Sequence, residues 1–197
     1  MDGIKSRITA YLDELRKWNK KINLISEKDL PDVEDRHYQD SIAVLELIPP
    51  NAHLLDMGSG NGFPSIPIAI HRPDVSVVAV EIKKKKALFL ENVSRRLNLN
   101  NYALMNISID DHQPHMEAAF DVVTSRAFKD LATILEKAYY FSRNNAHVLY
   151  YNSLSNNQID HIKPSLKKVI HNVNNLVYNL KNGETRSIID ITLNKVL

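Results

Sequence analysis

The chain has 197 residues, of which 44% are hydrophobic and 24% are charged, and its formal net charge is +2. This length and composition are typical of a globular domain with an apolar core. The absence of cysteine excludes disulfide bonds, thiolate metal sites and a cysteine nucleophile. The sequence contains neither a membrane-spanning apolar run nor the apolar core of a signal peptide, so we expect a cytoplasmic protein without membrane contact.

The first fifty residues are predicted to be helical. Apolar residues recur at helical spacing over residues 4–24, and a second helix is expected over residues 33–47, ended by two prolines. We therefore expect residues 1–50 to form a helical segment that packs on a larger domain of residues 51–197.

In the larger domain, predicted strands alternate with predicted helices. The strands cover residues 53–57, 75–81, 102–108, 120–127 and 146–151, and the helices cover residues 65–72, 83–99 and 130–143. The buried face of the helix over residues 83–99 is expected to comprise Ala87, Leu88, Leu90, Val93 and Leu97. Such alternation predicts right-handed crossovers and a mostly parallel sheet, that is, an α/β fold.

The end of the chain departs from this alternation. Two strand-like segments, residues 167–180 and 185–197, flank the pair Asn182-Gly183, which is typical of a hairpin turn. Strands joined by a tight turn are antiparallel. A parallel sheet that ends in an antiparallel hairpin suits a methyltransferase-type doubly wound domain better than a plain dinucleotide-binding domain.

A glycine-rich loop follows the first predicted strand. Gly58, Gly60 and Gly62 have the spacing Gly-x-Gly-x-Gly, which differs from the Gly-x-Gly-x-x-Gly of dinucleotide sites. Pro64 and Pro67 remove N–H groups that would otherwise face a pyrophosphate. The loop therefore favours a ligand that needs no phosphate cradle, such as S-adenosylmethionine; a tight turn without a ligand is the alternative.

Polar residues stand at the ends of the following strands. Glu81 ends the second strand, where an acidic side chain accepts hydrogen bonds from ribose hydroxyls. After the third strand, Asp110 is placed to meet an adenine amino group and Ile109 to pack on the ring. Arg126 ends the fourth strand and is a candidate to hold a carboxylate or a phosphate. The alternatives are that Glu81 is only an exposed glutamate, that Ile109 and Asp110 lie in an ordinary polar loop, and that Arg126 forms only a structural ion pair.

Four stretches in the same order carry a resemblance to a known family. They are "WNKKINL" (18–24), "RHYQDS" (36–41), "DMGSGNGFPSIPIAI" (56–70) and "FDVVTSRA" (120–127). Together they resemble the RsmG (GidB) family, bacterial methyltransferases that modify N7 of a guanine in 16S ribosomal RNA. The resemblance runs from about Tyr11 to the final hairpin. It implies a class I S-adenosylmethionine-dependent methyltransferase fold, Rossmann-like and seven-stranded.

The resemblance also implies roles for individual residues. The expected cofactor contacts are Gly58, Phe63, Ile109, Asp110 and Arg126, and the wider cofactor motif includes Asp56, Gly60 and Glu81. Arg126 and Lys85 are expected to take part in catalysis, and Arg36, His37 and Lys85 in RNA binding. His37 and its neighbours are also expected to link the helical segment to the glycine loop.

At several positions the sequence departs from the family pattern. Ser65 stands where the family usually has glycine, and Glu81 where it usually has aspartate. Ser108 replaces an arginine, and Asn152-Ser153 replaces a Lys-Gly pair. The loss of two basic residues puts RNA binding, more than cofactor binding, in question.

The implied chemistry needs neither a metal nor a general base. Guanine N7 already carries a lone pair, so in-line placement against the methyl group is the main requirement. The eight histidines show no metal-ligand spacing, so no metal is expected. The expected partner is 16S ribosomal RNA or the small ribosomal subunit, bound by a monomer. Three alternatives remain: a methyltransferase with another substrate, a cofactor-binding ribosome-associated protein with reduced turnover, and a nicotinamide-dependent oxidoreductase.

Overall fold

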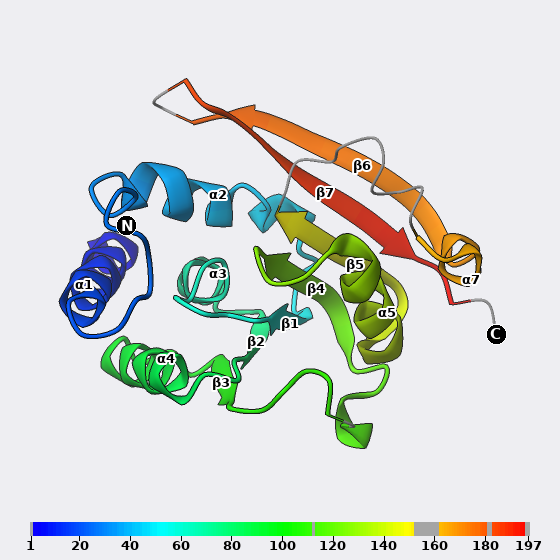
Figure 1. The fold of residues 1–197 in the computed structure, drawn as a ribbon, viewed down its shortest axis with the longest axis horizontal. Coiled ribbons are helices and arrows are strands. Elements are labelled where there is room, and N and C mark those ends of the chain that lie inside the picture. The colour runs from blue at the N-terminus through cyan, green and yellow to red at the C-terminus, as the bar shows by residue number, and fades with distance from the viewer. Residues whose placement is uncertain (1, 112, 152–161, 181–182, 196–197) are drawn as a thin grey trace.

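The computed structural model describes the chain except residues 1, 112, 152–161, 181–182 and 196–197 (Figure 1). Its centre is a seven-stranded sheet in the order β3-β2-β1-β4-β5-β7-β6. The strands are β1 (His53–Met57), β2 (Ser76–Val80), β3 (Tyr102–Met105), β4 (Phe120–Arg126), β5 (Ser142–Tyr151), β6 (Ile170–Asn179) and β7 (Thr185–Leu193). Strands β1 to β5 pair in parallel, and β7 is antiparallel to both β5 and β6. The predicted α/β class and the closing hairpin are thus confirmed.

Helices cover both faces of the sheet (Figure 1). Their bounds are α1 (Asp2–Asn19), α2 (Gln39–Ile42), α3 (Ser65–His71), α4 (Lys84–Arg96), α5 (Leu131–Phe141) and α7 (Pro164–Lys167). Neighbouring residues of β1 point to opposite faces: Leu54 packs with α1, α3 and α4, whereas Leu55 packs with α5 and α7. This alternation is the period of two that a pleated strand requires.

The N-terminal helices are shorter than their sequence pattern predicts. Helix α1 ends at Asn19 because the side chain of that residue accepts hydrogen bonds from the backbone N–H groups of Leu24 and Ile25, which fixes the following loop. The helix expected over residues 33–47 is instead three short helical segments: residues 34–38, α2, and residues 45–47. Ser41 Oγ donates to the carbonyl oxygen of His37 at 2.7 Å, a local bond of the kind that bends helices.

One predicted core position on α4 is wrong. Leu88 is 56% exposed, whereas Phe89 is fully buried in the same hydrophobic cluster as Leu90 and Val93. Each helical residue turns by about 100°, so Leu88 and Leu90, two residues apart, point to nearly opposite sides of α4 and cannot share its buried face.

A single hydrophobic cluster joins the N-terminal helix to the sheet. Ile8, Tyr11 and Leu15 of α1 pack in the same cluster as Leu54 and Val77. This cluster contains residues from both sides of position 50, so the division of the chain into a helical segment and a larger domain stays a prediction. Within the described part of the chain, no helix has the length and apolarity needed to cross a membrane.

Candidate functional site

The glycine loop lies at the carboxyl end of β1. The N–H groups of Gly58 and Ser59 both donate to the carbonyl oxygen of Val80 at 3.0 Å, which ties the loop to the end of β2. Gly58 has a φ of +75°, and a Cβ there would lie 2.4 Å from the Phe128 ring. This position therefore requires glycine twice over, for its backbone conformation and for the close approach of Phe128.

Ser65, where the family usually has glycine, has an ordinary backbone. It is the first residue of α3 and does not belong to the residues with positive φ. Its side chain is fully buried, and its Oγ lies 3.3 Å from Tyr102 Oη and 3.4 Å from the carbonyl oxygen of Gly62. The serine thus fits the loop without reshaping it.

A cavity of about 230 Å³ opens beside the loop. Its lining residues come from the N-terminal segment, the glycine loop, α4 and the end of β4: Leu24, His37, Gly58, Ser59, Gly60, Asn61, Phe63, Lys86, Arg126 and Ala127. In an open α/β sheet, ligands bind outside the carboxyl ends of the strands where the strand order reverses. Strand β1 lies between β2 and β4, so this cavity stands at that point.

Glu81 organises the backbone around the cavity. Its Oε2 accepts from the Gly60 N–H at 2.9 Å, and its Oε1 accepts from the Lys83 N–H at 2.7 Å. Each carboxylate oxygen has a second lone pair, so Glu81 retains acceptor capacity for a ligand hydroxyl. The extra methylene compared with aspartate lets one carboxylate connect the glycine loop to the start of α4.

Arg126 and Asp40 form an ion pair that joins β4 to the N-terminal segment. Arg126 Nη2 lies 3.1 Å from Asp40 Oδ2, and the two side chains are 16% and 8% exposed. Burial is the largest influence on both partners, lowering the pKa of Arg126 and raising that of Asp40. The guanidinium also lies 5.9 Å from the centre of the Phe63 ring, within cation–π distance.

His37 is held between Arg126 and the glycine loop. Its ring stacks on Phe63 with centroids 5.6 Å apart, and Arg126 Nη2 donates to its Nδ1. Burial, followed by the charge of Arg126, lowers the pKa of His37 to about 3, so the ring is neutral at physiological pH. Because Nδ1 accepts a hydrogen bond, the single proton resides on Nε2.

The Nε2 atom of His37 is buried and has no hydrogen-bond partner among the described residues. An unsatisfied buried donor costs about 1–3 kcal/mol. Since His37 lines the cavity, this N–H is available to a ligand acceptor there. The predicted link between the helical segment and the glycine loop is present in the His37–Phe63 contact.

The structure brings together only part of the expected site. Gly58, Gly60, Phe63, Arg126 and His37 line the cavity, and Glu81 binds the loop beside it. The remaining expected residues do not line it: Asp56, Lys85, Ile109, Asp110 and Arg36.

Each of these outlying residues has other surroundings. Asp56 is 1% exposed and accepts from Thr124 Oγ1 at 2.8 Å. Asp110 pairs with Lys129 and Lys137 at 2.8 and 3.0 Å, and the hydrogen bonds to both lysines lower its pKa. Ile109 is buried, and Lys85 is exposed on α4.

Arg36 pairs with Asp29 at 2.7 Å and with Glu184 at 3.4 Å, which connects the N-terminal segment to the hairpin. The roles expected for these outlying residues stay predictions.

Lys86 and Asn61 are cavity residues that the sequence did not single out. Lys86 lies in an unbroken run of four lysines, and only the phase of α4 decides which of them faces the loop. Asn61 receives a hydrogen bond from Tyr11 Oη at its carbonyl oxygen and donates through Nδ2 to the carbonyl oxygen of Leu24. The "NG" pair within the loop is the only sequence signal for it.

The residues around the cavity fit S-adenosylmethionine. At Gly60 a Cβ would point into space bounded by Lys86 Nζ at 3.8 Å and Glu81 Oε2 at 3.9 Å, so glycine keeps that space open. His37 Nε2–H and Lys86 are donors for a carboxylate, and Phe63 is an apolar wall. Small-molecule sites typically measure about 300–1,000 Å³, so this cavity accounts for part of such a ligand.

Comparison with protein families gives one match over most of the chain. The family model GidB, described as rRNA small subunit methyltransferase G, matches residues 4–189. A curated relative of that name from Syntrophotalea carbinolica is 40% identical over 133 residues, which are 67% of this chain and 61% of the relative. One from Legionella pneumophila (strain Corby) is 37% identical over 136 residues, which are 69% of this chain and 64% of the relative. The match thus spans about three fifths of the length of these relatives.

Solved structures share the fold at low sequence identity. A transferase from Pyrococcus horikoshii superimposes with a TM-score of 0.66 at 18% identity, covering 90% of this chain and 67% of that one. TYW2 from M. jannaschii, in complex with AdoMet, gives a TM-score of 0.66 at 17% identity over 90% of this chain and 80% of that one. At this identity the likeness establishes the fold alone.

Proposed function

Because the chain belongs to the GidB (rRNA small subunit methyltransferase G) family, we propose that it transfers a methyl group from S-adenosylmethionine to N7 of a guanine in 16S ribosomal RNA. The observation that carries the proposal is the cavity that joins the glycine loop, Phe63 and Arg126 at the carboxyl ends of β1 and β4. The expected partner is the small ribosomal subunit or its RNA, and we propose that a monomer in the cytoplasm binds it.

The protein's part in the reaction is binding and placement. S-adenosylmethionine, when bound, supplies an electrophilic methyl group on a sulfonium sulfur. Transfer to N7 would form a C–N bond from its lone pair and break the S–C bond, whose electron pair would stay on sulfur. Since N7 loses no proton, no general base is required, and correct alignment of the reacting atoms supplies the rate enhancement.

Side chains around the cavity support this assignment of roles. The backbone of Gly58 and Gly60, the Phe63 ring and the Glu81 carboxylate would hold the cofactor. Arg126 would fix the position of His37, whose Nε2–H is a donor for the cofactor carboxylate or an RNA phosphate. A neutral His37 adds no positive charge beside the base, which itself becomes positive on methylation.

Methyl transfer from labelled S-adenosylmethionine to small ribosomal subunits, followed by mapping of the modified base, tests the proposal. We expect label at N7 of a single guanine of 16S ribosomal RNA. Label on another RNA would indicate a methyltransferase with a different substrate. Calorimetric binding of the cofactor without any transfer would indicate a cofactor-binding protein, and binding of NAD in its place would indicate an oxidoreductase.

A further inference from the structure

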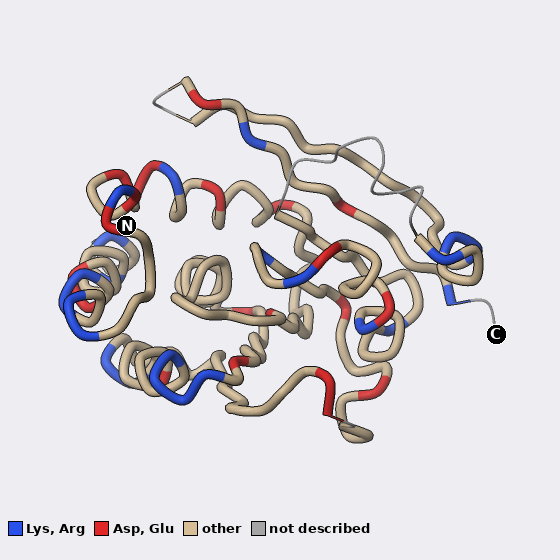
Figure 2. The backbone as a smooth tube through the Cα atoms, viewed as in Figure 1, with Lys and Arg blue, Asp and Glu red and all other residues tan. Residues whose placement is uncertain are grey.

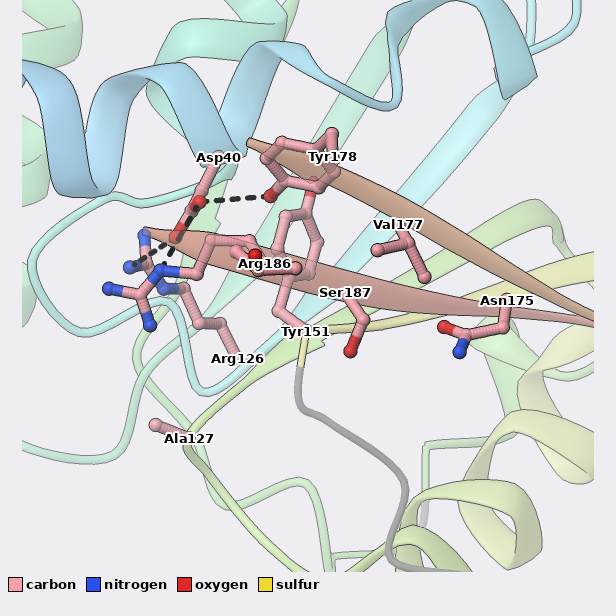
Figure 3. A pocket seen from close by; sticks show the side chains of 10 residues that line it. Asp40, Arg126, Ala127, Tyr151, Asn175, Val177, Tyr178, Arg186 and Ser187 are labelled. Atoms are coloured by element: carbon pink, nitrogen blue, oxygen red, sulfur yellow. Dashed lines mark hydrogen bonds and ion pairs between the residues drawn. The ribbon is translucent and has the colours of Figure 1, made fainter. Parts of the chain in front are cut away.

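A second cavity, of about 550 Å³, also borders Arg126 (Figure 3). It shares Arg126 and Ala127 with the glycine-loop cavity and is otherwise lined by different elements. Asp40 of α2, Tyr151 at the end of β5 and residues of the β6–β7 hairpin form its walls. Whatever binds there lies next to the cavity assigned to the methyl donor.

The polar side chains of this second cavity are arranged around Asp40. Tyr178 Oη donates to Asp40 Oδ1 at 2.9 Å, and Arg126 pairs with Asp40 Oδ2 at 3.1 Å (Figure 3). Tyr178 and Arg186 are directly opposite each other in the β6–β7 ladder, so both are placed by the same pair of strands. The Tyr178 ring is thereby held in one orientation against the cavity.

Two donors in this cavity have no hydrogen-bond partner among the described residues. They are Tyr151 Oη and Arg186 Nε. Tyr151 is only 8% exposed, and Asp40 Oδ1 lies 4.0 Å from Arg186 Nε, which is beyond hydrogen-bond distance. Burial raises the pKa of Tyr151 well above its ordinary value, so its hydroxyl stays protonated and can donate. Buried donors without a partner point to an acceptor supplied by a ligand.

The charges of the cavity favour a neutral ligand over a phosphate. Arg126 is paired with Asp40, and Arg186 is paired with Glu184 at 3.1 Å. Both guanidinium groups are therefore compensated by carboxylates. A free phosphate would meet little net positive charge, whereas a flat neutral base could stack on a tyrosine, a contact worth about 1–3 kcal/mol per base.

From these contacts we propose that the second cavity receives the acceptor guanine, turned out of the RNA so that it stacks on Tyr178 and accepts hydrogen bonds from Tyr151 Oη and Arg186 Nε. The inference rests on the proposed function, because it places the substrate base beside the methyl donor. Enzymes that modify bases commonly turn the target out of its stack in this way. Guanine O6 provides the required acceptor.

Guanosine titrated into the protein saturated with S-adenosylhomocysteine, followed by ligand-observed NMR, tests the assignment directly. The variant is Tyr151→Phe, which removes only the hydroxyl, and the matched control is Tyr139→Phe on the exposed face of α5. We expect Tyr151→Phe to raise the Kd of guanosine about 5- to 10-fold, with native affinity in the control. Because the lost hydroxyl has no partner among the residues that the structure describes, the thermal stability of Tyr151→Phe should equal or exceed that of the native chain.

The outcomes separate this inference from the proposed function. Equal guanosine affinity in Tyr151→Phe and the native chain would overturn the inference, as would displacement of guanosine by inorganic phosphate alone. Methylation of 16S ribosomal RNA with native KM in Tyr151→Phe would also overturn it while leaving the proposed function standing. Conversely, a Tyr151-dependent guanosine site in a protein that does not methylate small subunits would support the site and contradict the proposed RNA target.

Discussion

Arg126 has two roles that a single substitution would remove together. It lines both cavities, and it is the partner of the buried Asp40 carboxylate. Removing one member of a buried ion pair leaves an uncompensated charge, which costs about 3–5 kcal/mol. A loss of activity in Arg126→Ala therefore combines a damaged site with a destabilised fold.

Neutralising both partners separates the two effects. We expect Arg126→Ala to lower the free energy of unfolding by about 3–5 kcal/mol, and the double variant Arg126→Met with Asp40→Asn to recover most of that loss. Methyl transfer should remain at least about 100-fold below native in both, because His37 has lost the donor that positions it. Urea unfolding and single-turnover transfer measure the two quantities. Native transfer in the stable double variant would show that Arg126 is only a structural ion pair.

Ser65 offers a second test at the level of one residue. Its helical φ means that restoring the family's usual glycine brings no relief of strain and adds backbone freedom to the unfolded chain. We expect Ser65→Gly to destabilise the protein by about 1 kcal/mol in urea unfolding, with S-adenosylmethionine affinity within about twofold of native by calorimetry. Ser65→Ala is the control for the buried hydroxyl alone. A clearly tighter cofactor complex in Ser65→Gly would contradict an undisturbed loop.

Among the elements, the glycine loop and the loop after β4 constrain each other at Gly58 and Phe128. A Cβ at position 58 would lie 2.4 Å from the Phe128 ring, and the residue that carried it would have to adopt a φ of +75°. The requirement for glycine at position 58 therefore has two causes, which are the close packing of the Phe128 ring and the left-handed backbone conformation. The two contributions can be separated by a double-mutant cycle.

We expect Gly58→Ala to cost about 2–4 kcal/mol of unfolding free energy, from overpacking and left-handed backbone strain combined. In a Phe128→Ala background the same substitution should cost only the backbone part, about 1–2 kcal/mol. Chemical denaturation of the native chain, both single variants and the double variant gives the coupling. Purely additive costs would show that the Phe128 ring moves aside freely.

Strands β5 and β7 are connected by a side-chain pair that responds to pH. His147 Nδ1 lies 2.8 Å from Asp190 Oδ1, and this hydrogen bond raises the pKa of His147 above 6.5. A raised folded-state pKa means that the stabilisation is fully present below the unfolded-state pKa and is lost as pH rises through the folded-state value.

The stability difference between the native chain and His147→Gln should therefore be larger at about pH 5.5 than at about pH 8.5. Urea unfolding at both values measures it, with Asp190→Asn as a second variant that removes the charged partner. A difference that grows with increasing pH would contradict the assigned pair.

The sequence was informative about elements whose periodicity is decided locally. An apolar run predicted β1, and prolines near the start of a helix predicted α3. The Asn182-Gly183 pair correctly indicated an antiparallel pair of strands at the end of the chain, although Asn182 itself lies outside the described residues. The segmented helix at residues 34–47 was not predictable, because a side-chain bond from Ser41 competes with regular helical pairing. Likewise, which lysine faces the cavity depends on the rotation of α4, and the second cavity depends on the hairpin packing against α2.

At the scale of the whole molecule, positive charge is distributed unevenly although the net charge is only +2. Figure 2 marks lysine and arginine positions in blue along α1 and at the start of α4, with a smaller group at α7. The α1–α4 group adjoins the glycine-loop cavity through Lys86, so it is the surface on which we expect RNA phosphates to lie. Asn152, which replaces a basic residue of the family, lies outside the described residues.

Lys85 tests this arrangement, since it is exposed on α4 next to Lys86 but does not line the cavity. If it contacts a phosphate, Lys85→Ala should weaken binding to 16S ribosomal RNA and reduce the slope of log K against log salt concentration by about 0.7–0.9, with kcat near native. The matched control is Lys168→Ala, an exposed lysine at the end of α7, on the other side of the molecule from α4 (Figure 1). Filter binding across a salt series gives the slopes, and steady-state methylation gives kcat. An unchanged slope with a large fall in kcat would instead place Lys85 in catalysis, because its charge would then affect the reacting atoms and not the binding of RNA phosphates.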